Sequence, residues 1–299
     1  MKQAFIKLHL SILIAGFTGI FGKLITLNEG LLVWYRMLIT AILLFFMLWI
    51  SKKLQRVPLK DMLRIGGVGL LLGLHWVFFY ASIKASNVSI GVVCFSIAGF
   101  FTAIFEPIIN RHRISFKELL FSIVALFGIF LIFHFDTRYR TGIILGTVSS
   151  ALAALFVITN KKVSITYNWG TTLFYEIVGG FACLSLLLPI YLHFFPVGSF
   201  VPSKLNIIYL LLFSLVCTIG LYMLQIQALK HISAFTLNLS YNLEPIYSII
   251  LAMIIFGEAK DLDPAFYIGL GLIILSVILQ MWSVMRQRKK SLQKEFMLE

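Results

Sequence analysis

Residues 80–111 read YASIKASNVSIGVVCFSIAGFFTAIFEPIINR, and residues 226–257 read IQALKHISAFTLNLSYNLEPIYSIILAMIIFG. When the two segments are aligned 146 positions apart, Lys84 falls on Lys230, and a serine-containing stretch follows each lysine. Duplicated hydrophobic units of this size are typical of many membrane transporters. The alignment therefore predicts a chain made of two related halves and makes transport the first hypothesis for function.

The composition excludes an ordinary water-soluble domain. Of the 299 residues, 60% are hydrophobic and only 12% are charged, and the mean hydropathy is +0.97. Soluble domains carry about 25% charged residues, because their surfaces face water. A chain with half that share cannot cover itself with polar groups, so we expect lipid to surround it.

Apolar runs divide the chain into membrane-spanning segments. A helix that crosses a bilayer needs ~20 mostly apolar residues. Three spans with one internal charge each are expected at 7–27, 31–51 and 234–256. Seven further runs contain no Asp, Glu, Lys or Arg: 65–83, 85–105, 119–135, 141–160, 177–203, 205–229 and 264–285. These segments predict an all-α integral membrane protein with ten transmembrane helices.

The ten spans divide into two units of five. The first repeat is expected over 6–135 and the second over 141–285, followed by a basic cytoplasmic tail over 286–299. Because five is an odd number, the second unit enters the membrane from the opposite side. The units then form an inverted-topology pair around a central cavity, related by a pseudo-two-fold axis in the membrane plane.

The positive charges predict the orientation. If the N-terminus is cytoplasmic, ten spans return the C-terminus to the cytoplasm as well. Eighteen Lys and Arg residues then lie on the inner side and five on the outer side, which is a positive-inside bias. The outer five are Lys84, Arg138, Arg140, Lys204 and Lys260. We therefore expect a multi-pass protein of a bacterial-type inner membrane, with its basic tail attracted to membrane lipid and no nucleic-acid partner.

Residues 242–258 (NLEPIYSIILAMIIFGE) carry a family resemblance. An apolar stretch that opens with Glu-Pro and ends on Gly-Glu resembles the ninth-helix signature of the EamA family in the drug/metabolite transporter superfamily. Four other segments are similar to that family: ALKHISA (228–234), IKAS (83–86), Gly22-Lys23 and Tyr35-Arg36. The resemblance covers residues 6–283 in all. The resemblance implies ten helices around a central cavity and secondary transport, often export, of small metabolites.

The two halves differ at the signature itself. Glu244-Pro245 falls on Ala98-Gly99, so the first half lacks the proline that many members of the family have there. Gly257-Glu258 falls on Arg111-His112, so the first half lacks that closure too. The mechanism is therefore not expected to be strictly symmetric.

Glu244 is the deepest charge in the predicted spans, about ten residues into its helix. A charge at that depth costs about 2.5–3.5 kcal/mol on insertion scales, so it needs a reason. With Pro245, which removes a helical hydrogen bond, Glu244 is a candidate coupling or gating site that binds a proton or a substrate amine. The alternative is a structural anchor. Asn238, Tyr241 and Asn242 share a stripe with Pro245, which either lines the cavity or forms helix–helix hydrogen bonds.

An aromatic patch with a histidine is expected near the middle of the third span, and its members are His75, Trp76, Phe79 and Tyr80. Their counterparts in the eighth span include Tyr222 and Gln225. These side chains are candidates for lining a cavity in which an apolar or aromatic solute could stack. The alternative is ordinary packing, because aromatic residues make up 15% of the chain.

Two cations are expected inside spans. Arg36 lies about five residues below the outer end of the second span, a depth that suits pairing with Glu244 or capture of a substrate carboxylate. Lys23 lies near the outer end of the first span, where it can snorkel to the interface. Arg36 is therefore the candidate for substrate binding.

Other polar and small residues inside spans are expected to be structural. Glu106 and Glu176 are placed near cytoplasmic helix ends, where the available cationic partners are Lys161, Lys162, Arg111 and Arg113. Small residues suit close helix packing, and those considered are Gly66, Gly67, Gly69, Gly73, Gly269 and Gly271. The tenth span suits either dimer contact or lipid contact, so a homodimer stays open.

The motifs favour a transporter over an enzyme or a channel. The spans contain no HExxH motif, no Gly-x-Ser-x-Gly motif and no pair of aspartates, and the chain has no Walker-type loop. The cysteines Cys94, Cys183 and Cys217 form no framework for a disulfide or a metal. We therefore expect no catalytic residue, cofactor or metal. Together with the inverted repeat, the family resemblance implies a secondary active transporter that exports small metabolites such as amino acids by alternating access. A flippase for a lipid-linked substrate and an importer of a small organic solute are the alternatives.

Overall fold

The computed structural model describes residues 2–111, 113, 116–135, 137–163, 166–229 and 243–296. Within these ranges all regular structure is helical. The first half contains α1 (Lys2–Leu24), α2 (Glu29–Ile50), α3 (Leu59–Ala85), α4 (Val88–Phe95), α5 (Ala98–Asn110) and α6 (Phe116–Phe135). The second half contains α7 (Arg140–Val163), α8 (Trp169–Phe194), α9 (Lys204–Ser214), the π-helical segment η2 (Leu215–Gly220), α10 (Leu221–Leu229), α12 (Glu244–Phe256) and α13 (Pro264–Phe296). Two short 3-10 turns, η1 (Thr137–Tyr139) and η3 (Glu258–Lys260), precede α7 and α13.

The described helices have the length and composition expected of a multi-pass membrane protein. Seven helical segments are long and apolar enough to cross a membrane: Gln3–Leu24, Glu29–Ile50, Leu59–Ala85, Val88–Asn110, Arg140–Val163, Trp169–Phe194 and Lys204–Leu224. The segment Val88–Asn110 joins α4 and α5, and Lys204–Leu224 joins α9, η2 and the start of α10. Three shorter apolar helices, Ser122–Phe133, Glu244–Phe256 and Pro264–Leu279, lie at the positions of the three remaining predicted spans. The predicted all-α membrane fold is confirmed, although residues 230–242 of the ninth span lie outside the described part of the chain.

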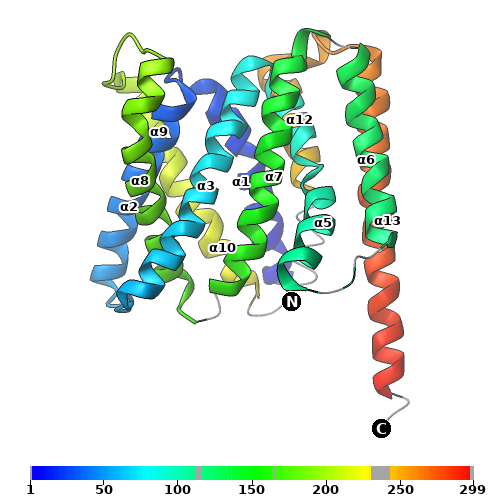
Figure 1. The fold of residues 1–299 in the computed structure, drawn as a ribbon, viewed down its shortest axis with the longest axis horizontal. Helices are drawn as coiled ribbons and strands as arrows, with labels where there is room; N and C mark the ends of the chain where they lie inside the picture. The colour runs from blue at the N-terminus through cyan, green and yellow to red at the C-terminus, as the bar shows by residue number, and fades with distance from the viewer. Residues whose placement is uncertain are drawn as a thin grey trace.

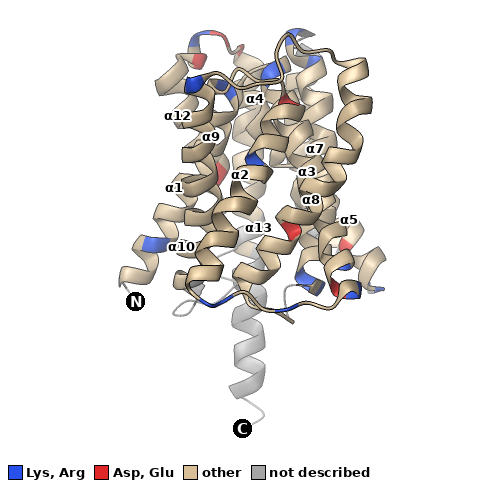
Figure 2. Ribbon diagram, turned by 90° about the vertical axis from the view of Figure 1, so that its left-hand side faces the viewer, with Lys and Arg blue, Asp and Glu red and all other residues tan. Residues whose placement is uncertain are grey.

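The distribution of side chains agrees with a bundle whose middle lies in lipid. Lys, Arg, Asp and Glu gather at the two ends of the bundle, and few lie between them (Figure 2). Large apolar side chains such as Leu186, which is 78% exposed, cover the sides of the helices. In water such a surface would be unfavourable, whereas hydrocarbon is a good solvent for it.

Asparagine side chains begin three of the helices. The Oδ1 atoms of Asn28, Asn87 and Asn168 accept hydrogen bonds of 2.8–2.9 Å from the backbone N–H groups three residues further on. These caps start α2, α4 and α8. The first N–H groups of a helix have no partner within the helix, so a capping oxygen is especially valuable near a membrane.

The repeat has a precise structural counterpart in α5 and α12. Both helices have 13 residues, and their first and last residues are the same 146 positions apart that align the sequences. The residue before α5, Ile97, has φ −81° and ψ 0°, and the residue before α12, Leu243, has φ −82° and ψ −15°. Both helices end at a left-handed residue, Arg111 with φ 55° and Gly257 with φ 67°. The duplicated segments therefore keep the same backbone although their side chains differ.

The two halves interleave. Helix α3 packs against α7 and α8, and the corresponding segment of the second half, α9 with η2 and α10, packs against α1 and α2. Helices α4 and α5 pack against α7, while α12 packs against α1. At one edge of the bundle α6 and α13 stand side by side (Figure 1). Each half therefore completes the packing of the other, as expected of a pseudo-symmetric pair.

Glycines allow α3 and α8 to approach closely. A Cβ atom on Gly66 would lie 3.2 Å from the Cα atom of Gly179, and one on Gly69 would clash with the backbone carbonyl of Glu176. A Cβ atom on Gly67 would meet nothing within 4 Å. The predicted close packing is thus confirmed for Gly66 and Gly69 and wrong for Gly67, which faces away from the contact.

Candidate functional site

A cavity of about 200 Å³ lies inside the bundle, where residues from both halves meet. Its wall is formed by α1, α2, α3 and α4 from the first half, and by α7, η2, α10 and α12 from the second half. Most of its lining is aromatic or apolar, and its charged lining residues are Arg36 and Glu244. The predicted candidates among its lining are Arg36, His75, Trp76, Phe79, Tyr80, Tyr222 and Glu244. The structure therefore brings together seven side chains that are widely separated in the sequence.

Arg36 is held between two aromatic rings. Its guanidinium carbon lies 3.7 Å from the centre of the Trp76 ring and 3.9 Å from that of the Phe213 ring. It donates hydrogen bonds to the Tyr80 hydroxyl at 2.7 Å and to the Thr218 hydroxyl at 3.0 and 3.2 Å. The side chain is only 2% exposed. Its planar shape explains this position, because guanidinium stacks on aromatic faces and also presents donors at its edge.

Pairing with Glu244 was one of the two roles considered for Arg36, and this ion pair is not formed. Among the described residues, the groups that Arg36 contacts are neutral, and its charge has no carboxylate partner. Both residues nevertheless line the same cavity. The site therefore presents a cation and a carboxylate on separate walls, with space between them.

The π-helical segment η2 supplies a contact that the sequence did not predict. A π-helix has a wider turn than an α-helix, and such segments are frequent at functional sites. Here it carries Thr218, which accepts two of the Arg36 hydrogen bonds, and Cys217, which lines the cavity. Because Thr218 lies in an uncharged apolar run, no spacing or charge signal marked it in advance.

His75 connects the cavity wall to α7. Its Nδ1 atom lies 3.0 Å from the backbone oxygen of Ser149 and 2.8 Å from the Ser149 hydroxyl. The imidazole ring also lies 5.4 Å, centre to centre, from the ring of Phe95. The histidine thus has a structural role in joining α3 to α7 while its ring faces the cavity.

The remaining candidates divide into two groups. Glu244, the first residue of α12, lines the cavity, whereas Pro245 faces a small separate space beside Ser96 and α13. The structure therefore separates the two members of the predicted coupling pair. The other candidates lie outside the described part of the structure: Asn238, Tyr241 and Asn242 entirely, and Gln225 by its side chain.

The fourth span is broken in the middle, where a continuous helix was expected over 85–105. Helix α4 ends at Phe95 and α5 begins at Ala98. The N–H groups of Ser96 and Ile97 donate to carbonyls three residues back, at 3.0 and 3.1 Å, in place of the α-helical fourth. In the alignment of the repeats, the break lies next to Ala98, which is the position equivalent to Glu244. The first half has no proline there, so nothing in the sequence indicated the break. Broken helices of this kind form the binding sites of many transporters with inverted repeats.

Two other membrane carboxylates behave differently. Glu106 approaches Lys161 at 3.6 Å, which is the kind of partner expected for it. Glu176 is only 1% exposed, and its Oε1 atom has no hydrogen-bond partner. Among the described residues, Glu176 pairs with none of the four cations considered for it, because its side chain is buried beside the glycine contact between α3 and α8.

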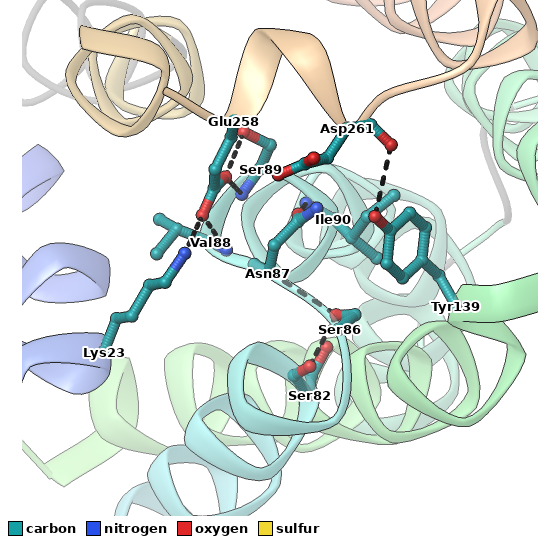
Figure 3. A network of polar contacts seen from close by, with 10 residues as sticks. All are labelled: Lys23, Ser82, Ser86, Asn87, Val88, Ser89, Ile90, Tyr139, Glu258 and Asp261. Carbon is teal, nitrogen blue, oxygen red and sulfur yellow. Dashed lines mark hydrogen bonds and ion pairs between the residues drawn. The ribbon is translucent and has the colours of Figure 1, made fainter. Parts of the chain in front are cut away.

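Lys23 does not simply snorkel. Its Nζ atom lies 2.8 Å from the Oε1 atom of Glu258, which is only 1% exposed. The same carboxylate accepts hydrogen bonds from the backbone N–H groups of Val88 and Ser89 and from the Ser89 hydroxyl (Figure 3). Burial by itself raises the pKa of Glu258, but these donors outweigh it, so the pKa lies below its ordinary value.

Comparison with known proteins agrees with this architecture. Apolar helices in two related halves, with a mostly aromatic cavity between them that holds one cation and one carboxylate, form the arrangement expected of a multi-pass membrane transporter. The chain belongs to the EamA-like transporter family, whose model matches residues 4–134 and 140–282. Members of this family are transporters, and the two matched segments cover both halves.

Individual relatives are distant. The chain is 24% identical over 304 residues to the uncharacterized transporter YxxF of Bacillus subtilis, covering 98% of this chain and 94% of that protein. It is 25% identical over 207 residues to an uncharacterized transporter of Clostridium kluyveri, covering 66% and 65% of the two chains. A protein crystal structure at 16% identity superposes with a TM-score of 0.57 and covers 93% of this chain and 96% of that chain. That similarity shows the fold.

Proposed function

We propose that this protein is a secondary active transporter that exports small zwitterionic metabolites, such as amino acids, across the cytoplasmic membrane. The observation that carries the proposal is that Arg36 and Glu244 line the same aromatic cavity without forming an ion pair with each other. A guanidinium without a carboxylate partner attracts an anionic group, and a carboxylate attracts an ammonium group. A zwitterion presents both.

The size and lining of the cavity narrow the substrate class. Pockets for drug-sized ligands are ≈ 300–1,000 Å³, whereas this cavity has about 200 Å³. Trp76, Phe79 and Phe95 line it, so an apolar or aromatic side chain would be accommodated. The carboxylate of the solute would bind at Arg36, and its ammonium group would bind between Glu244 and the aromatic faces.

Alternating access is the proposed mechanism. Inverted halves can exchange conformations, which would open the cavity to each side in turn around a fixed binding site. Glu244 is proposed to couple transport to protons, because an ionisable group in a membrane cavity can exchange a proton when the cavity faces water. The proposed export direction rests on the frequency of export in the family.

Proteoliposome flux tests the proposal. Uptake and efflux of a panel of amino acids and other metabolites would be measured with and without a pH gradient. We expect flux for zwitterions, weaker flux for analogues that lack either charged group, and stimulation by a pH gradient. In Glu244→Gln, the stimulation should disappear while the protein remains folded. If Glu244→Gln keeps full pH-dependent flux, the coupling role is wrong, and if only uptake is driven, the protein is an importer.

A lipid-linked substrate flippase is the second candidate. An apolar cavity of about 380 Å³ lies among α2, α3, α7 and α8, and Leu187 and Phe195 at its wall are exposed on the outside of the bundle. Such a groove could accept a lipid tail. Lipid scrambling in proteoliposomes without flux of any soluble solute would favour this candidate.

A further inference from the structure

Glu258 joins segments from both halves at the end of the bundle opposite the two chain termini. It lies just after α12, in the second half, and it contacts Lys23 of α1 and the start of α4, both in the first half. We propose that this set of contacts, called here the latch (Glu258, Lys23, Val88 and Ser89), holds the transport path closed on that face and must break for it to open. This inference rests on the proposed transport function.

The latch lies above a tight seal between α1 and its neighbours. Tyr80, which lines the cavity, places its ring directly against Gly22. One turn earlier on α1, a Cβ atom on Gly19 would lie only 2.9 Å from the Cγ1 atom of Val88. No room remains between α1 and these residues. Separation of α1 from α3 and α4 would therefore be needed to open the cavity toward this face.

The Glu258 carboxylate is well suited to hold α1 and α4 together. Its oxygens accept from Lys23 Nζ at 2.8 Å, Val88 N at 3.0 Å, Ser89 N at 2.9 Å and Ser89 Oγ at 2.7 Å (Figure 3). Two of these donors are backbone N–H groups in the first turn of α4, which have no partner within the helix. The helix dipole also favours a negative charge at this position. Charge-assisted hydrogen bonds are about twice as strong as neutral ones. One side chain thus fastens three segments.

Water can reach the latch from one side. Lys23 is 38% exposed, and its ammonium group also lies 4.3 Å from the centre of the Phe256 ring. The loop that carries Glu258 has a separate anchor, because Arg138 and Tyr139 donate to the carbonyl oxygen of Asp261 at 3.0 and 3.3 Å. Removal of the latch would therefore leave the loop attached while removing the charged link between α1 and α4.

The first repeat does not contain the carboxylate on which the latch depends. The position equivalent to Glu258 in the first half is His112, which cannot supply a carboxylate to the opposite face. The two faces must therefore be closed by different contacts.

Accessibility of a cavity cysteine from each face tests the latch without any need for a substrate. The native Cys94, Cys183 and Cys217 are replaced by alanine, and Thr18→Cys places a reporter in the cavity wall. A membrane-impermeant maleimide is applied to vesicles whose orientation is determined with a cleavable C-terminal tag. In Glu258→Gln we expect the labelling rate from the face opposite the termini to rise about tenfold, because charged hydrogen bonds of the closed state are weakened.

Two further variants keep the test decisive. Ser89→Ala removes a single hydrogen bond and should give a smaller increase, which still provides a result if Glu258→Gln does not fold. Asp263→Asn is the matched control, because its ion pair with Arg138 lies at the same end but is exposed, 58% and 49% at the two side chains. It should leave labelling unchanged.

The outcomes separate the latch from general loosening and from the transport proposal. Unchanged labelling from the latch face in folded Glu258→Gln overturns the latch. Equal increases from both faces also overturn it, because they would indicate loss of packing. If labelling increases only from the latch face in a protein that moves no solute of the panel, the latch is supported and the proposed substrate class is rejected.

Discussion

Arg36 shows how a charge is accommodated at residue scale in this bundle. Two aromatic faces cover its guanidinium, and two hydroxyl groups accept from its edge. Its place was predictable in part, because a cation in an apolar run stands out in the sequence. Phe213 and Thr218 were not predictable, because they lie in an uncharged apolar run and no charge or motif distinguishes them from their neighbours.

Arg36→Lys should therefore damage transport although the substitution keeps the positive charge. An ammonium group is compact, so it cannot stack between Trp76 and Phe213 while donating to both Tyr80 and Thr218. We expect initial flux at low substrate concentration to fall roughly tenfold or more, since stacking and directed hydrogen bonds are both lost.

The measurement is the concentration dependence of proteoliposome flux. Arg64→Lys, at an exposed arginine on α3, is the control and should keep normal flux. Normal flux in Arg36→Lys as well would mean that the cavity needs only a positive charge there, and the stacked geometry would have no part in binding.

Helix contacts decide the fold at element scale. The sequence predicts where most helices lie, because charge and apolar runs are strong signals for membrane spans. It does not reveal that α4 stops at Phe95 or that η2 is π-helical. Both irregularities lie in uncharged apolar runs without proline, where local sequence is compatible with a continuous helix and tertiary packing selects the break.

The α3–α8 contact provides a test of packing. In Gly69→Ala, the new Cβ atom would clash with the backbone carbonyl of Glu176, which cannot move like a flexible side chain. We expect a loss of about 1–3 kcal/mol in stability, as for other overpacked sites. The thermal unfolding midpoint in detergent measures the effect.

Gly67→Ala is the matched control on the same helix. A Cβ atom there meets nothing within 4 Å, so its stability should be equal to or slightly above that of the parent because alanine favours helix. If both variants lose the same stability, the close α3–α8 approach is not responsible.

At the scale of the whole molecule, Glu258 connects the two halves, and its charge should make their association depend on pH. Its pKa in the folded protein lies below the ordinary value of 4.5, so the charged carboxylate stabilises the folded state. That contribution is complete above about pH 4.5 and is lost as the pH falls through the lowered pKa. A single group contributes a slope of at most about 1.4 kcal/mol per pH unit.

We therefore expect the thermal midpoint of the parent to fall below pH 4.5 more steeply than that of Glu258→Gln. The two curves should differ most at neutral pH, where the parent is more stable, and approach each other in acid. Asp263→Asn should follow the parent. Parallel curves for the parent and Glu258→Gln would show that the carboxylate contributes nothing through its charge.

The sequence by itself determined the membrane class, the approximate spans, the duplication and the inverted arrangement of its halves. These follow from composition, charge and spacing, because a bilayer imposes the same length and polarity on every span. It also nominated Arg36, the aromatic patch around His75 and Glu244 for one cavity. Polar groups within apolar runs are few, so each stands out.

Only the tertiary structure decided which of those groups meet. Arg36 contacts Tyr80 and Thr218 and forms no ion pair with Glu244, while Lys23 binds Glu258 across 235 positions of sequence. Local sequence cannot determine such pairings, because they depend on the angles and distances at which helices pack. The glycine contacts, the broken fourth span and the π-helical turn fix those distances, and with them the cavity and the latch.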